Sequence, residues 1–188
     1  WEIIFWDNQS FDKTSEIVKE YKDHRINYFY SKNLNVIYKA RNLALEKCKG
    51  EVVTFLDSDD IWTDYKLQEQ IKFLKKGYKI IYGNYQLINE KGEIINHKLK
   101  KNPSGKITRN LLRKNPISIG CIMIDKKLII NNKFNPFYEL LGDFELWVRL
   151  SLKYEFFFIN KIFEYSRQHG NNYTILYGNS MAKEKRYF

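Results

Sequence analysis

The chain has 188 residues, enough for one domain with a single sizeable core. Hydrophobic residues make up 44% of it, which excludes a disordered chain, and no apolar run approaches the roughly 20 residues that a membrane-spanning helix needs. The formal net charge of +10 would suit a nucleic acid, an anionic membrane surface or a phosphorylated substrate. The basic residues are dispersed and accompany no nucleic-acid-binding motif, so most of them are expected on solvated faces.

The first half of the sequence alternates expected strands and helices. Strands are predicted at residues 2–6, 26–30 and 52–56, and helices from residue 14 onward, at 36–48 and at 65–76. The first helix is expected to turn Ile17, Val18 and Tyr21 inward. The order βαβαβα implies right-handed crossovers, and therefore an α/β fold with a mostly parallel sheet and helices on both faces.

The second half has a less regular pattern within the same single domain, residues 1–188. It predicts a short strand at 79–82, a hairpin over 85–98 that turns at residues 90–92, and a polar loop leading to a short helix at 108–113. A strand at 117–124, an amphipathic helix at 143–152, a strand-like segment at 156–159 and a basic helical tail from Tyr177 follow.

Three carboxylates end the third predicted strand. Asp57, Asp59 and Asp60 follow the apolar run of residues 52–56, which is typical of a strand buried on both faces. Such acids would repel one another unless a cation or hydrogen-bond donors compensate, and ligands of open α/β sheets bind at strand ends. The pattern favours a divalent-metal site for a phosphorylated substrate, and the alternative is an acidic turn that caps the next helix through Asp60 or Thr63.

An ordered set of short motifs runs across nearly the whole chain. The motifs are Asp7-Asn8-Gln9-Ser10, Ala40-Arg41-Asn42, Gly50-Glu51, Phe55-Leu56-Asp57-Ser58-Asp59-Asp60, Gly142-Asp143-Phe144-Glu145-Leu146-Trp147 and Tyr165-Ser166-Arg167-Gln168-His169. Together they resemble the inverting family-2 glycosyltransferases, which have the GT-A fold. The resemblance implies transfer of a sugar from a nucleotide-diphosphate donor, most often UDP-linked, to a glycan or lipid-linked acceptor in the synthesis of a surface polysaccharide.

The resemblance also implies roles for the donor-binding residues. Asp57-Ser58-Asp59 matches the family's DxD motif, in which the first acid approaches the ribose and the last binds the metal, Mg²⁺ or Mn²⁺. Asp7 matches the position that contacts the nucleotide base, although the same residue also suits an Asx turn. Arg41 matches an arginine that faces the donor. Asp60 either lies behind the metal-binding residues or caps a helix, and the cap is favoured.

The acceptor side depends on a single acid. Asp143 matches the family's base, which deprotonates the acceptor hydroxyl, and Gly142 replaces the acid that usually precedes it. Removing that neighbouring charge would slightly lower the pKa of the base. A helix-capping aspartate is the alternative for Asp143, and Glu145 is the weaker candidate for the base. His169 is implied as a ligand of the metal or of the diphosphate, although one residue is inserted between Tyr165 and Arg167 relative to the family pattern.

The family normally has an apolar strand and a helix before the position of Trp1, so the chain is expected to lack the start of the catalytic domain. A non-catalytic remnant of such an enzyme is therefore one alternative function, and a basic nucleic-acid-binding module is a weaker one. Cys48 and Cys121 are too few for a disulfide framework, and we expect a cytoplasmic protein held peripherally at the inner face of the cell membrane, with no nucleic acid bound.

Overall fold

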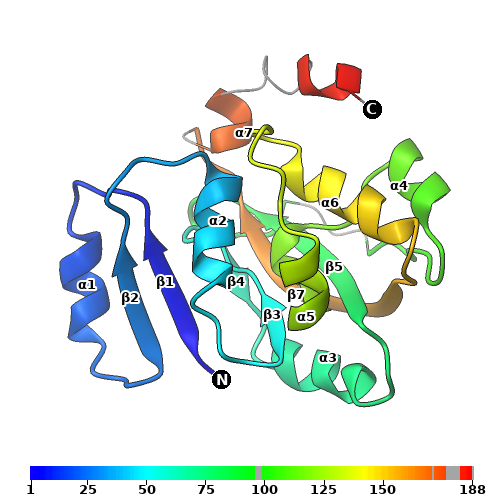
Figure 1. The fold of residues 1–188 in the computed structure, drawn as a ribbon, viewed down its shortest axis with the longest axis horizontal. Coiled ribbons are helices and arrows are strands. Elements are labelled where there is room, and N and C mark those ends of the chain that lie inside the picture. The colour runs from blue at the N-terminus through cyan, green and yellow to red at the C-terminus, as the bar shows by residue number, and fades with distance from the viewer. Residues whose placement is uncertain (96–98, 171, 177–182, 188) are drawn as a thin grey trace.

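The computed structural model describes residues 1–95, 99–170, 172–176 and 183–187 (Figure 1). Its strands, in chain order, are β1 (Ile3–Asp7), β2 (Ile26–Tyr30), β3 (Val52–Thr54), β4 (Ile61–Trp62), β5 (Ile80–Ile88), β6 (Ile122–Asp125) and β7 (Phe157–Arg167). Its α-helices are α1 (Thr14–Glu20), α2 (Ile37–Leu45), α3 (Lys66–Leu74), α4 (Thr108–Arg113), α5 (Lys126–Asn131), α6 (Gly142–Ser151) and α7 (Tyr173–Leu176). Among the described residues there are also two 3-10 helices, η1 (Ile119–Cys121) and η2 (Lys185–Tyr187).

The strands form two sheets. Strands β1 and β2 pair in parallel, and the other five lie in the order β3-β6-β5-β7-β4. In the larger sheet β5 and β7 are parallel, whereas β6 runs antiparallel to both β3 and β5, and β4 antiparallel to β7. The predicted α/β fold is confirmed, but the larger sheet is mixed rather than mostly parallel, because β6 returns between β3 and β5 against the direction of both.

Helices connect and cover these sheets (Figure 1). Helix α2 contacts β1 and so joins the small sheet to the rest of the molecule. Helix α3 packs on β5 and β7, α5 packs on β6, and α6 packs against α4. The core between them consists of buried apolar side chains from β5, β6, α6 and β7, including Ile80, Ile81, Ile122, Ile124, Leu146, Trp147, Leu150 and Phe163.

The edges of the larger sheet differ from the prediction. The strand predicted at residues 52–56 ends at Thr54, lies at the edge of the sheet and leaves Leu56 47% exposed. Strand β5 runs from Ile80 to Ile88, so it joins the strand predicted at 79–82 to the first arm of the hairpin predicted over 85–98. The chain turns back after it, with a bridge between Ile88 and Ile94. The predicted turn is therefore present, and residues 96–98 of the predicted hairpin lie outside the described part of the chain.

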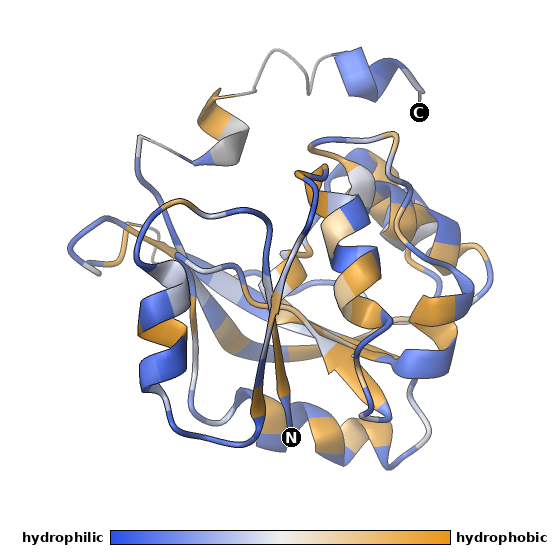
Figure 2. Cartoon of the chain, turned by 60° about the vertical axis from the view of Figure 1, so that its left-hand side comes forward, coloured by the Kyte–Doolittle hydropathy of each residue, from blue (hydrophilic) through white to orange (hydrophobic). Residues whose placement is uncertain are grey.

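Helix α1 is the least embedded of the longer elements. Of the side chains expected to point inward, Ile17 is 52% and Tyr21 is 65% exposed, and α1 buries no residue fully. Figure 2 shows the ribbon of α1 as mostly hydrophilic residues with a single hydrophobic band. A two-stranded sheet offers too little apolar area to cover a helix, which explains the exposure.

A lysine is buried where α3 meets the sheet. Lys66 is 0% exposed, and its Nζ donates hydrogen bonds to Thr54 Oγ1 at 2.6 Å and Gln70 Oε1 at 2.7 Å. Burial lowers the pKa of Lys66 to about 7, since an ammonium group is costly to remove from water. These bonds connect the first turn of α3 to strand β3.

The predicted helical tail falls partly outside the described residues. Residues 177–182 of the tail lie outside the described part of the chain, and η2 follows them. In Figure 1 this C-terminal segment lies on the same side of the molecule as α7 and the start of α6.

Candidate active site

The three acids that follow β3 each interact with a different partner. Asp57 Oδ1 accepts a hydrogen bond from Arg41 Nη2 at 2.6 Å, and Asp59 Oδ2 lies 3.0 Å from His169 Nε2. Asp60 Oδ1 accepts a hydrogen bond from the backbone N–H of Arg167 at 2.7 Å. Each carboxylate therefore has its own donor, which offsets the repulsion expected from their sequence spacing.

Arg41 connects the donor-side acids to the predicted base. Its side chain comes from α2, is 13% exposed and forms a salt bridge with Asp57. Burial disfavours its charge, but Asp57, Tyr38 and Asp143 together raise the pKa of Arg41. The structure thus brings Arg41, Asp57 and Asp143 into one electrostatic cluster, as the motifs predicted.

His169 is the second predicted residue that lies beside the acidic loop. Asn172 donates a hydrogen bond to Asp59 Oδ2 at 3.3 Å and another to the carbonyl of Arg167 at 3.0 Å, so it holds the turn that carries His169. The described residues contain no group of three His, Cys, Asp or Glu side chains that could bind a metal by themselves. Asp59 and His169 fit a metal that takes its remaining ligands from a bound diphosphate and from water, which is the usual way Mg²⁺ binds in nucleotide sites.

Asp60 has a different role from the predicted one. Helix α3 begins at Lys66 with Tyr65 as its N-cap residue and no side-chain cap, so neither Asp60 nor Thr63 caps it. Asp60 instead lies beside Glu164 of β7, whose carboxyl oxygens are buried close to Asp60 and Ser118. Burial raises the pKa of both carboxyl groups, and the proximity of Asp60 raises that of Glu164 further.

Asp143 lies in the first turn of α6. The helix begins at Gly142 with Leu141 as its N-cap residue, so the alternative of Asp143 as the N-cap is wrong. Asp143 Oδ1 accepts hydrogen bonds from the Tyr38 hydroxyl at 3.1 Å and from the backbone N–H of Phe144 at 2.7 Å. Burial raises the pKa of Asp143 and outweighs the lowering by Arg41, so the slight lowering expected from Gly142 is not the dominant effect.

Gly142 has a steric role that its motif position does not reveal. A Cβ atom at this residue would lie 2.5 Å from Cδ2 of Tyr38, closer than side chains pack. The Tyr38 hydroxyl shares its one hydrogen between Asp143 and the carbonyl of Leu140, which lies 2.8 Å away. The missing side chain therefore lets Tyr38 reach both Leu140 and Asp143.

Glu145, the weaker candidate for the base, points elsewhere. Its carboxylate accepts hydrogen bonds from Arg149 Nε at 2.8 Å and Nη2 at 3.0 Å. This one-turn pairing on α6 occupies both oxygens and agrees with the prediction.

Asp7 is the one predicted site residue that no described interaction connects to the others. It ends β1 in the small sheet and is 2% exposed. Its Oδ1 accepts from Ser10 N at 2.7 Å and its Oδ2 from the Tyr28 hydroxyl at 2.6 Å. Burial alone would raise the pKa of Asp7, but these two hydrogen bonds lower it, so the turn-forming role is present and the contact with a nucleotide base stays a prediction.

The motifs did not reveal Tyr38, Glu164 or Glu184. Tyr38 and Glu164 fall at positions that the alternation of polar and apolar residues assigns to ordinary core or strand sites. Glu184 lies among basic residues in the tail, yet it is 7% exposed and bound to the loop before α6. A buried acid in a basic segment is recognisable only from the structure.

The chain is similar to known proteins in sequence and in fold. The model of glycosyl transferase family 2 matches residues 1–131. The UDP-Glc:alpha-D-GlcNAc-diphosphoundecaprenol beta-1,3-glucosyltransferase WfgD of Escherichia coli is 34% identical over 151 residues, which are 80% of this chain and 58% of WfgD. The putative teichuronic acid biosynthesis glycosyltransferase TuaG of Bacillus subtilis is 35% identical over 132 residues, which are 68% of this chain and 51% of TuaG.

The solved structures support the fold. TarS of S. aureus, residues 1–349 in complex with UDP, aligns with a TM-score of 0.72 at 19% sequence identity, covering 90% of this chain and 52% of that one. The chain thus spans a little over half the length of these relatives. Its motifs, its GT-A fold and the match over residues 1–131 agree, and the chain belongs to glycosyl transferase family 2.

Proposed function

We propose that this chain forms the donor-binding and catalytic part of an inverting glycosyltransferase whose donor is a nucleotide-diphosphate sugar, UDP-linked as in WfgD. The observation that carries the proposal is the position of Asp143, a carboxyl group with a raised pKa beside the Arg41–Asp57 pair. A carboxyl group with a raised pKa beside a fixed charged pair is typical of sites that perform acid–base chemistry.

In the proposed mechanism, Arg41 and Asp57 orient the donor, and Asp7 contacts its base. Asp143 accepts the proton of the acceptor hydroxyl while the oxygen of that hydroxyl attacks the anomeric carbon from the face opposite the leaving diphosphate. The configuration inverts, and no covalent enzyme intermediate forms. A raised pKa makes Asp143 a better proton acceptor near neutral pH than an ordinary aspartate.

The same proposal includes a divalent metal, Mg²⁺ or Mn²⁺. Asp59 and His169 would hold it together with oxygens of the donor diphosphate, and the metal would supply positive charge against the charge that develops on the leaving group. Asn172, through its hydrogen bond to Asp59, keeps this carboxylate oriented toward His169.

The test is the variant Asp143→Asn, compared with Glu145→Gln on the same helix as the matched control. We expect Asp143→Asn to abolish sugar transfer while the affinity for UDP, measured by calorimetry with and without Mg²⁺, stays within about twofold, since a neutral amide cannot accept the proton. Glu145→Gln should transfer sugar at nearly the normal rate, because Glu145 is paired with Arg149.

Normal turnover by Asp143→Asn would refute the assignment of the base. A wild-type chain that binds UDP but neither transfers nor hydrolyses a donor would support the non-catalytic alternative. If a chelator left UDP affinity unchanged, the metal part of the proposal would be wrong.

A further inference from the structure

The C-terminal segment makes a specific connection to the loop that carries the proposed base. Glu184 is buried in this segment, whereas its neighbours Lys183, Lys185 and Arg186 are exposed. Its carboxylate accepts hydrogen bonds from three consecutive backbone N–H groups, those of Glu139 at 2.6 Å, Leu140 at 3.2 Å and Leu141 at 2.8 Å.

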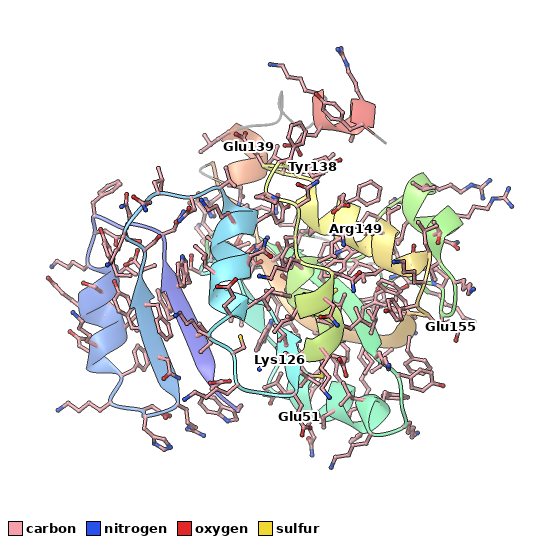
Figure 3. All side chains as sticks on the ribbon, in the orientation of Figure 1. Glu51, Lys126, Tyr138, Glu139, Arg149 and Glu155 are labelled. Carbon is pink, nitrogen blue, oxygen red and sulfur yellow. The ribbon has the colours of Figure 1, made fainter. Side chains whose placement is uncertain are left out.

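These amides lead directly into α6. Leu141 is the N-cap residue of the helix and supplies no side-chain cap, so the loop depends on an acceptor from elsewhere. A carboxylate is also favoured at this end by the helix dipole. Figure 3 shows Tyr138 and Glu139 beneath the C-terminal segment, at the end of α6 where the helix begins.

The backbone N–H and carbonyl groups of Leu140 link Glu184 to the proposed base. The N–H of Leu140 donates to Glu184, and its carbonyl shares the single hydroxyl hydrogen of Tyr38 with Asp143 Oδ1. Glu184 and Tyr38 therefore hold one short loop from two sides. The loop fixes the position of Asp143, and Glu184 and Tyr38 together fix the position of the loop.

We propose that Glu184 is a positioning residue for Asp143: by binding the amides of residues 139–141 it fixes the loop from which Asp143 reaches the acceptor hydroxyl. This inference rests on the proposed function only for its catalytic consequence. Its structural part, the attachment of the tail to the loop, stands on the hydrogen bonds alone.

The catalytic test compares Glu184→Gln with Glu155→Gln, an exposed glutamate that Figure 3 places at the far end of α6. An amide keeps the shape of Glu184 but loses the charge and one acceptor oxygen. We expect kcat for transfer to fall on the order of tenfold to a hundredfold, as for a misplaced catalytic group, with the KM for the donor unchanged. Glu155→Gln should behave as the wild type.

A double-mutant cycle tests whether Glu184 acts through Leu140. If it does, combining Glu184→Gln with Tyr38→Phe should lower kcat little further than the more damaging single change, because both act on one loop. The pH at which activity falls on the acid side should shift upward in Tyr38→Phe, since a hydrogen bond to the ionised Asp143 is lost, and in the same direction in Glu184→Gln. Fully additive losses, or an unshifted profile in Glu184→Gln, would overturn the positioning role.

Amide hydrogen exchange provides a readout that does not need activity. Exchange at Leu140 and Leu141 should accelerate in Glu184→Gln and stay unchanged in Glu155→Gln. An active wild type with normal kinetics in Glu184→Gln would overturn this inference while leaving the proposed function intact. If the wild type were inactive, the exchange rates alone would decide, and unaltered exchange in Glu184→Gln would overturn the attachment itself.

Discussion

At the scale of single residues, the contact between Gly142 and Tyr38 determines how closely α2 approaches the base. Gly142 is the first residue of α6, where helix propensity alone would make alanine more stable than glycine by up to about 1 kcal/mol. We expect the opposite for Gly142→Ala, a loss of about 1 to 3 kcal/mol in the free energy of unfolding, since the added Cβ would overlap the buried Tyr38 ring.

Denaturant unfolding of Gly142→Ala measures this loss, with Gly170→Ala as the control, because a Cβ at Gly170 would meet no atom within 4 Å. A Gly142→Ala protein as stable as the wild type would show that Tyr38 can move aside at no cost. Transfer activity should also fall in this variant, since Tyr38 holds Asp143.

The sequence indicated candidate residues for the site but not the contacts among them. Asp57, Asp59, Asp143 and His169 were recognisable because carboxylates at strand ends and an ordered set of motifs point to one chemistry. The partners of these residues were not, because Tyr38 and Glu184 are distant in sequence from the base they support. Asp60 was predicted as a cap because its neighbour Glu164 is 104 positions away and only the fold brings them together.

At the scale of elements, strand β7 carries the buried acid Glu164 and ends beside the candidate metal site. The folded-state pKa of Glu164 is raised above its usual value, so its contribution to stability is present below about pH 4.5 and is lost as the pH rises through the folded-state pKa. We expect Glu164→Gln to remove this loss and to be more stable than the wild type at pH 7 by about 1 to 3 kcal/mol.

Thermal unfolding of both proteins from pH 4 to pH 8 measures the effect, with Glu155→Gln as the exposed control. The two curves should converge at the acid end and separate as the pH rises. Parallel curves would mean that Glu164 is not the group that titrates.

Elements defined by local sequence were predicted well, and those defined by pairing were not. Strand β2 and helix α4 have the bounds that the residue pattern predicted. The direction of β6 between β3 and β5 was missed, because the pairing of distant strands is not encoded in the periodicity of any one of them. Helix α1 has the predicted amphipathic pattern but lacks a surface large enough to bury it.

At the scale of the whole molecule, basic and apolar side chains gather on the C-terminal segment near the start of α6. Phe137 and Tyr187 are 63% and 65% exposed and pack edge to face, with Lys185 and Arg186 beside them. No helix in the described ranges combines the length and apolar character needed to cross a membrane. We expect this face, with its basic residues beside exposed aromatic rings, to bind anionic lipid surfaces.

Vesicle sedimentation tests this surface. The chain should bind vesicles that contain anionic lipid more tightly than zwitterionic ones, and added salt should weaken the binding. The double variant Lys185→Gln/Arg186→Gln should bind about thirtyfold less tightly, at about 1 kcal/mol per basic residue, while Lys13→Gln/Lys19→Gln on the α1 side should not. Equal binding to both vesicle types would exclude an electrostatic membrane contact.

The chemical reactivity of the buried Lys66 amine can report on the separation of α3 from the larger sheet. An amine with a pKa of about 7 is largely unprotonated at pH 8 and hence nucleophilic, but it is enclosed between α3 and the larger sheet. An acylating reagent can reach it only when that packing separates, so the rate of its modification in intact protein would follow the opening of the sheet. Mass spectrometry of the acylated lysines could then show whether UDP slows that opening.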